Sequence, residues 1–175
     1  MDNEDVHKAL HQCRSERGWQ IGLSVSSPKQ DEVIRRAIEI EVEGQRLFDS
    51  VQCTYNVLEQ RPAPALQLAH EAGMDIIIKE GLANGRVLRH EATVKYAENL
   101  ACPPDALALA CILAQPFQPR VLSGAVTPEQ LQSNLQAYKV AETLKSDQCL
   151  LATIMTECSM VSEEYWTDRS NLAWN

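Results

Sequence analysis

Hydrophobic and polar positions follow one repeating order along most of the chain. A short run rich in β-branched residues is followed by a turn, and then by a segment with apolar residues at helical spacing. Four such runs occur, at residues 20–25, 47–52, 75–79 and 120–123. This order is typical of βα units and of a parallel sheet. We therefore predict an α/β fold with about four βα units.

The three consecutive isoleucines of residues 75–79 interrupt the usual alternation of apolar and polar positions. A strand without alternation is expected to be buried on both faces, as strands of parallel sheets are. Residues 106–114 are almost wholly apolar, so a helix there must be covered on several sides.

Two of the predicted helices start with the same pattern. Ser27-Pro28-Lys29-Gln30 and Thr127-Pro128-Glu129-Gln130 each place a capping side chain before a proline, with a glutamine to complete a capping box. Further helices are expected over residues 3–17 and after Pro64. Residues 142–175 are expected to form one last helix and a tail.

Composition excludes several classes of function. The 175 residues are the size of one domain, 45% hydrophobic and 23% charged, as expected for a globular protein. A net charge of −8 argues against a nucleic-acid binder. The chain has no apolar run of about 18 residues and an acidic start where a targeting peptide would be basic, so no membrane span is expected.

The six cysteines form no C-x-x-C pair, which favours reduced thiols and a cytoplasmic location. Cys53 has no identifiable base beside it and is not expected to act as a nucleophile. His7 and His11 are four residues apart, but a third ligand is not evident, so no metal site is predicted and a solvent-facing helix surface is expected instead.

Five segments, in their order and spacing, resemble an aldo/keto reductase. They are residues 21–26, 48–59, 78–86, 121–125 with Gln130 and Asn134, and 165–174. The resemblance covers nearly all of residues 1–175 and implies a TIM-type (β/α)8 barrel of NADP-dependent carbonyl reductases. A typical barrel has about 250 residues. The resemblance therefore implies a partial domain, the C-terminal half-barrel from the helix after the fourth strand onward, with residues 142–175 as its tail.

The same resemblance assigns cofactor-binding roles. Ser24 and Gln52 match positions that hold the nicotinamide carboxamide, although Val25 replaces the asparagine that the family often has. Lys79 stands where many members have an aromatic residue that stacks on the nicotinamide ring; it is expected either to contact phosphate or to pair with Glu80. A matching pyrophosphate loop contains Gly81, Leu82, Ala83, Asn84 and Gly85, and the matches at the adenosine end are Ser123, Gly124, Gln130 and Asn134.

Plainer explanations stay open for several of these residues. The Ser24 hydroxyl could hydrogen-bond to nearby backbone groups, and the loop glycines could be needed where the backbone takes positive φ. Gln130 could be only the capping partner of Thr127. The 2′-phosphate has no basic partner between Gly124 and Asn134, so NADP rests on family precedent, NAD is not excluded, and Arg86 is a candidate substitute.

Two functions follow from the resemblance. The first is an oxidoreductase that moves a hydride between a nicotinamide dinucleotide and a carbonyl or alcohol. The family's tyrosine, aspartate, lysine and histidine tetrad lies on strands outside this half, so no catalytic residue is assigned and the isolated chain is expected to be inactive. The second is a non-catalytic nucleotide-binding, regulatory or interaction half-barrel, or a gene fragment.

A half-barrel would leave two sheet edges and an inner face uncovered. We therefore expect a homodimer, a complementing N-terminal half, or poor solubility.

Overall fold

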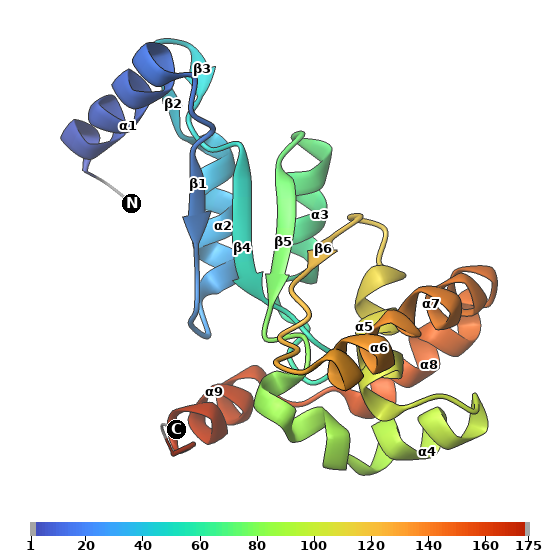
Figure 1. Ribbon diagram of the computed structural model, residues 1–175. Helices are drawn as coiled ribbons and strands as arrows, with labels where there is room; N and C mark the ends of the chain where they lie inside the picture. Colours follow the sequence, from blue (N-terminus) through green and yellow to red (C-terminus); the bar gives the residue numbers. More distant parts are fainter. Residues whose placement is uncertain (1–2, 174–175) are drawn as a thin grey trace.

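The computed structural model describes residues 3–173. These residues form nine α-helices, one 3₁₀ helix and six strands (Figure 1): α1 Glu4–Arg17, β1 Gly22–Ser24, α2 Gln30–Glu39, β2 Glu41–Val42, β3 Gln45–Arg46, β4 Ser50–Thr54, α3 Ala63–Glu71, β5 Asp75–Lys79, η1 Ala83–Arg89, α4 Glu91–Asn99, α5 Pro104–Leu113, β6 Arg120–Val121, α6 Pro128–Leu135, α7 Ala137–Ser146, α8 Gln148–Cys158 and α9 Ser162–Ser170.

Four strands form one parallel sheet in the order β1-β4-β5-β6. Ser24 lies opposite Gln52, and Thr54 lies opposite Lys79. The predicted α/β class with a parallel sheet is thus confirmed. The two remaining strands, β2 and β3, form an antiparallel hairpin that the sequence did not predict. Its turn has positive φ at Glu43 (53°) and Gly44 (75°), as a two-residue type I′ turn requires.

Helix α2 does not begin with the predicted capping box. Ser27 Oγ accepts from the Lys29 amide at 3.2 Å, while Gln30 points inward and is buried. Its amide group bonds to both backbone groups of Thr54, donating to the carbonyl at 2.8 Å and accepting from the N–H at 3.2 Å. Satisfying the buried end of β4 outweighs the local cap.

Helix α6 begins as predicted. Thr127 Oγ1 accepts from the Gln130 amide at 3.2 Å, and Gln130 Oε1 accepts from the Val126 amide at 2.8 Å.

The expected single helix after residue 142 is wrong, because the structure has α7, α8 and α9 in this part of the chain. Asp147 caps a new helix, since its Oδ1 accepts from the Leu150 amide at 2.9 Å. Trp174, the end of the last segment that resembles the family, lies outside the described residues.

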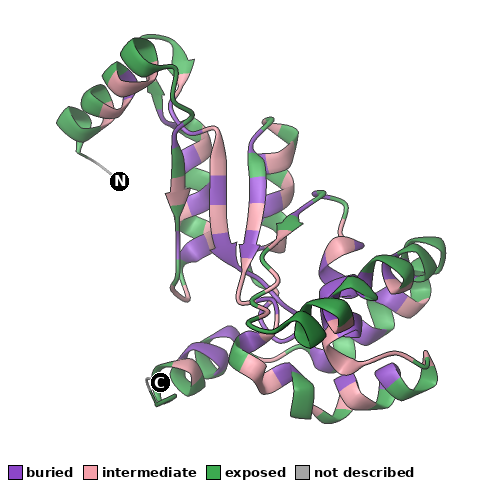
Figure 2. Cartoon of the chain, in the orientation of Figure 1, coloured by how far each residue is buried: buried purple, intermediate pink, exposed green. Residues whose placement is uncertain are grey.

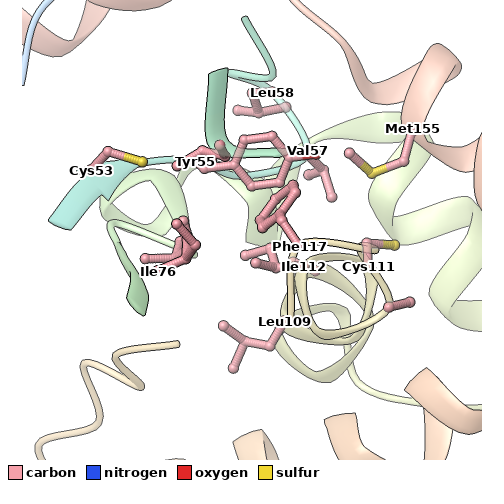
Figure 3. Packing of buried hydrophobic residues seen from close by; sticks show 14 of the residues in the cluster. Cys53, Tyr55, Val57, Leu58, Ile76, Leu109, Cys111, Ile112, Phe117 and Met155 are labelled. Carbon is pink, nitrogen blue, oxygen red and sulfur yellow. The ribbon is translucent and has the colours of Figure 1, made fainter. Parts of the chain in front are cut away.

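In the core, buried side chains of β4 and β5 pack near those of α5 (Figure 3). As predicted, every residue from 106 to 112 in α5 is buried. Tyr55 and Phe117 meet edge to face with ring centroids 5.4 Å apart, beside Ile112 and close to the buried side of the sheet.

The opposite face of the sheet has no helix over it in the described chain (Figures 1 and 2). Ile76 and Ile78 are buried against the core, but Ile77 between them is only partly buried. The prediction that this strand is buried on both faces is therefore wrong. We call this uncovered side the open face; it includes Ser24 and Lys79, which are hydrogen-bonded to each other on the side of the strands away from the buried Ile76 and Ile78.

Across residues 3–173, the helices are all too short or too polar to cross a membrane.

Candidate cofactor-binding site

Three of the predicted site residues meet around one hydroxyl group at the carboxyl ends of β1, β4 and β5. Lys79 Nζ donates to Ser24 Oγ at 2.9 Å, and Gln52 Nε2 donates to the same oxygen at 3.4 Å. Ser24 is exposed, whereas Gln52 and Lys79 are half-buried. Side chains at the carboxyl ends of parallel strands are where α/β folds bind ligands. This arrangement presents amide, hydroxyl and ammonium groups to the open face.

Lys79 and Glu80 do not pair with each other. Glu80 turns to Arg169 of α9, whose Nε donates to Oε2 at 2.8 Å. Within residues 3–173 no carboxylate forms an ion pair with Lys79, and its ammonium is directed to Ser24. The hydrogen bond of this cation at the edge of the open face is therefore to a neutral group.

The predicted pyrophosphate loop follows directly, but its first glycine has a packing role. A Cβ at Gly81 would lie 3.1 Å from both Ile112 Cδ1 and Leu109 Cδ2. Asn84 (φ 57°) and Gly85 (φ 84°) take positive φ, so the plainer explanation applies to Gly85 and not to Gly81. Leu82 packs on the core, and Asn84 is exposed.

Of the four residues predicted at the adenosine end, Ser123 and Gly124 lie in the loop after β6, and Gln130 and Asn134 lie in α6. Asn134 is buried and its Nδ2 donates to Ser123 Oγ at 2.9 Å and to Ser123 O at 3.2 Å. Gly124 is exposed with φ 67°, and Gln130 is held by its bond to Val126. These contacts hold the loop that connects β6 to α6.

Helix α9 lies at the carboxyl ends of the strands. It is bound to the segment after β4 through residues for which the sequence predicted no role. Asn56, just after β4, is fully buried. Its Nδ2 donates to Glu80 O at 2.9 Å and to Tyr165 Oη at 3.0 Å. Its Oδ1 accepts from the amides of Leu58 and Glu59, both at 3.0 Å. The only sequence signal was that Asn56 and Tyr165 lie in segments that resemble the family.

Glu59 makes a second link to α9. Ser162 Oγ donates to Glu59 Oε2 at 2.7 Å, while Glu59 Oε1 is buried with no hydrogen-bond partner among the described residues. Burial raises the pKa of the Glu59 carboxyl, and the hydrogen bond from Ser162 partly opposes this shift. This carboxyl therefore retains its proton to a higher pH than an exposed glutamate.

Arg86, the candidate for the 2′-phosphate, contacts α9. Its guanidinium carbon lies 4.1 Å from the Tyr165 ring centroid, and its Nη1 donates to Tyr165 O at 3.2 Å. Its Nε donates to Ala83 O at 3.0 Å. The structure thus uses this arginine to join the 83–89 segment to α9.

Two residues considered in the sequence as a nucleophile and as a metal ligand, Cys53 and His11, lie away from the open face. Cys53 is buried on the core side, and burial raises the pKa of its thiol to about 12, so it is not a thiolate nucleophile at neutral pH. His11 is buried, contrary to the expected solvent-facing position, and its Nε2 lies 3.4 Å from Glu43 Oε2. Residues 3–173 hold no cluster of three side chains suited to a metal ion.

Comparison with known proteins gives a fold but no family model. No protein-family model matches the sequence, and no curated protein matches it either. Among solved structures, the aldo-keto reductase AKR11C1 from Bacillus halodurans is similar. Its holo form aligns with 21% identity and a TM-score of 0.59, over 77% of this chain and 49% of that one. The chain is similar in fold to about half of an aldo-keto reductase.

Two further structures give the same result. The apo form of the Bacillus enzyme aligns with 21% identity and a TM-score of 0.61, over 78% of this chain and 52% of that one. A protein whose assignment as 2,5-diketo-D-gluconic acid reductase B is provisional aligns with 20% identity and a TM-score of 0.59, over 87% of this chain and 50% of that one. The resemblance to aldo-keto reductases is thus confirmed at the level of the fold, and the chain spans about half the length of these proteins.

Proposed function

We propose that this chain is the cofactor-binding half of an NAD(P)H-dependent oxidoreductase with a (β/α)8 barrel. The observation that carries the proposal is the meeting of Ser24, Gln52 and Lys79 at the carboxyl ends of three neighbouring strands. The aldo-keto reductase fold supports the choice of a nicotinamide dinucleotide over other ligands.

The donors at this edge suit the nicotinamide carboxamide. Gln52 offers both an N–H donor and a C=O acceptor, and Ser24 offers a hydroxyl that can do either. A carboxamide needs this combination, since it has two donors and one acceptor. When bound, the dinucleotide would supply the hydride for a carbonyl, or accept one from an alcohol.

The remaining site residues would hold the rest of the cofactor. The 81–85 loop, with Leu82 and the backbone at Asn84 and Gly85, would face the pyrophosphate. Ser123, Gly124, Gln130 and Asn134 would line the adenosine end, beside the N-terminus of α6, where free N–H groups favour an anion. NADP is the proposed form, and NAD remains the alternative.

A complementing N-terminal half, within a longer polypeptide or on a separate chain, would close the barrel. Three features support this proposal. The chain spans about half of its structural neighbours. The open face is uncovered, and Leu131, Leu135 and Tyr138 expose apolar side chains at i, i+4 and i+7 along α6 and the start of α7. A second copy of this chain is the alternative occupant.

The missing half would also supply the acid that protonates the carbonyl oxygen. The tyrosines just after β4 and in α9, Tyr55 and Tyr165, are both buried, and the Tyr165 hydroxyl is bound to Asn56. We therefore propose that the isolated chain has little reductase activity. A cytoplasmic site of action is part of the proposal, because all six cysteines are unpaired.

Titration calorimetry of the full chain with NADPH and NADH tests the proposal. We expect binding, with the S24A/Q52A double variant weakened about tenfold or more, since it loses two hydrogen-bonding groups. Gln132→Ala, at an exposed position of α6, is the control and should bind as the unmodified chain does. Absence of binding to both dinucleotides would contradict the proposal.

Oxidation of NADPH with a simple aldehyde, followed by absorbance, tests the half-barrel proposal. Steady turnover by the isolated chain would show that no second half is needed. Binding that never leads to turnover, even with a complementing half supplied, would favour the non-catalytic nucleotide-binding module.

A further inference from the structure

The ammonium group of Lys79 lies at the edge of the open face and is bound to a neutral hydroxyl group. Its Nζ donates to Ser24 Oγ at 2.9 Å, and it forms no ion pair within residues 3–173. An ion pair of the same sheet, between Asp75 and Arg120 at 3.4 Å, lies where β5 begins, whereas Lys79 lies where β5 ends. Any ligand group bound at Ser24 therefore lies close to the ammonium group of Lys79.

We propose that Lys79 makes this site select the reduced form of the dinucleotide over the oxidised form. This inference rests on the proposed function, which places the nicotinamide at Ser24 and Gln52. The oxidised nicotinamide ring carries a positive charge, whereas the reduced ring is neutral. Lys79 therefore repels the oxidised ring and weakens its binding, whereas it does not repel the neutral reduced ring.

Many aldo/keto reductases have an aromatic residue at this position, and its effect on the binding of the oxidised ring is opposite to that of lysine. The face of an aromatic ring is negative and attracts a cation. The ammonium group of a lysine repels the same cation. Lysine at this position therefore acts on a positively charged ring in the opposite sense to an aromatic residue, while the hydrogen bonds to the carboxamide can be kept.

The size of the effect follows from the exposure of the lysine. Two unit charges a few ångström apart, at the effective dielectric constant of a protein surface, change an affinity by about tenfold to a few hundredfold. Lys79 is half-buried and water screens part of its charge. We expect the reduced form to bind about tenfold more tightly than the oxidised form.

The experiment compares the affinities of NADPH and NADP⁺ for the full chain by calorimetry. The two ligands share the same phosphates, ribose and adenine and differ only in the nicotinamide ring, so the change of the affinity ratio on substituting Lys79 reports the effect of its charge on that ring. In Lys79→Met we expect this ratio to fall by about tenfold, mainly through tighter binding of NADP⁺. Lys79→Arg keeps the charge and should keep the preference.

Lys139→Met, at an exposed position of α7, is the control for a general loss of positive charge. It should leave the ratio unchanged. Circular dichroism checks the fold of each variant; if Lys79→Met does not fold, Lys79→Gln takes its place.

The outcomes separate the two proposals. If both forms bind and the ratio is the same in the unmodified chain and in Lys79→Met, the inference is wrong while the proposed function stands. If neither form binds, both are wrong. A ratio that rises with decreasing salt in the unmodified chain, but not in Lys79→Met, would further support an electrostatic cause.

Discussion

The guanidinium of Arg169 binds the carboxylate of Glu80 through two nitrogens, which fixes helix α9 at the carboxyl end of β5. Nε lies 2.8 Å from Oε2, and Nη2 lies 2.5 Å from Oε1. The two residues are 89 positions apart in the sequence. This pair frees Lys79 from its neighbour Glu80 and leaves the lysine to the open face.

Arg169→Lys should lower the free energy of unfolding by about 1–2 kcal/mol, because lysine cannot form the two-nitrogen contact and the pair is partly buried. Urea denaturation of both proteins measures the difference. Arg89→Lys, at an exposed position, is the matched control and should change stability by less than about 0.5 kcal/mol. Equal effects of the two substitutions would contradict the assigned role of Arg169.

Gly81→Ala should destabilise the fold by about 1–3 kcal/mol, because the added Cβ would press on Ile112 and Leu109. Ile112→Val removes the Cδ1 that the new methyl group would meet. Thermal unfolding of the two single variants and the double variant gives the interaction energy. We expect Gly81→Ala to cost less in the Ile112→Val background; an equal cost in both backgrounds would contradict the assigned contact with Ile112.

Glu59→Gln should change how stability depends on pH. The folded-state pKa of Glu59 is raised by burial, so its contribution to stability is fully present below the ordinary pKa and is lost as the pH rises through the raised pKa. The glutamine variant lacks this loss. Its stability relative to the unmodified chain should therefore increase from acidic to neutral pH, as measured by the melting temperature across that range.

Glu98→Gln, at an exposed position of α4, controls for the loss of one negative charge. A stability difference that is independent of pH for Glu59→Gln would refute the raised pKa.

Cysteine labelling should follow burial. Cys149 is exposed, whereas Cys53 and Cys111 are buried and the pKa of each thiol is raised by that burial. At neutral pH and without denaturant, iodoacetamide should modify Cys149 at least about tenfold faster than either buried thiol. Peptide mass spectrometry after brief labelling reads this out. Rapid modification of Cys111 in the folded chain would be inconsistent with the packing around α5.

The apolar stripe of α6 and α7 should drive self-association of the isolated chain. The double variant L131E/L135E removes two of its exposed side chains and should shift sedimentation toward the monomer. Leu68→Glu alters a leucine of similar exposure on α3 and is the control. A monomer at all concentrations for the unmodified chain would argue against a docking surface here.

The sheet could be predicted from the sequence because each strand is marked by a local run of β-branched residues. The helices of residues 142–175 could not be predicted, because the spacing of apolar residues suggests one continuous helix. In the structure, Asp147 caps a new helix within this segment. Gln30 was assigned a local cap, but its partner, Thr54, lies 24 residues away.

For the candidate site, the positions of the residues could be predicted from the sequence, but the contacts between them could not. The strand ends that carry Ser24, Gln52 and Lys79 follow from the pattern, but the contact between Lys79 and Ser24 depends on strand register across β4. Register is set by the whole sheet, so the sequence alone did not indicate it.

The strand order β1-β4-β5-β6 also determines how the backbone opens. The amides of β4 and β5 have bonded strands on both sides, while β1 and β6 each have a bonded strand on one side only. In hydrogen–deuterium exchange, deuterium should therefore enter β1 and β6 first and the two middle strands last. A complementing half that pairs with β1 and β6 would slow exchange in these two strands far more than in β4 and β5, which marks barrel closure residue by residue.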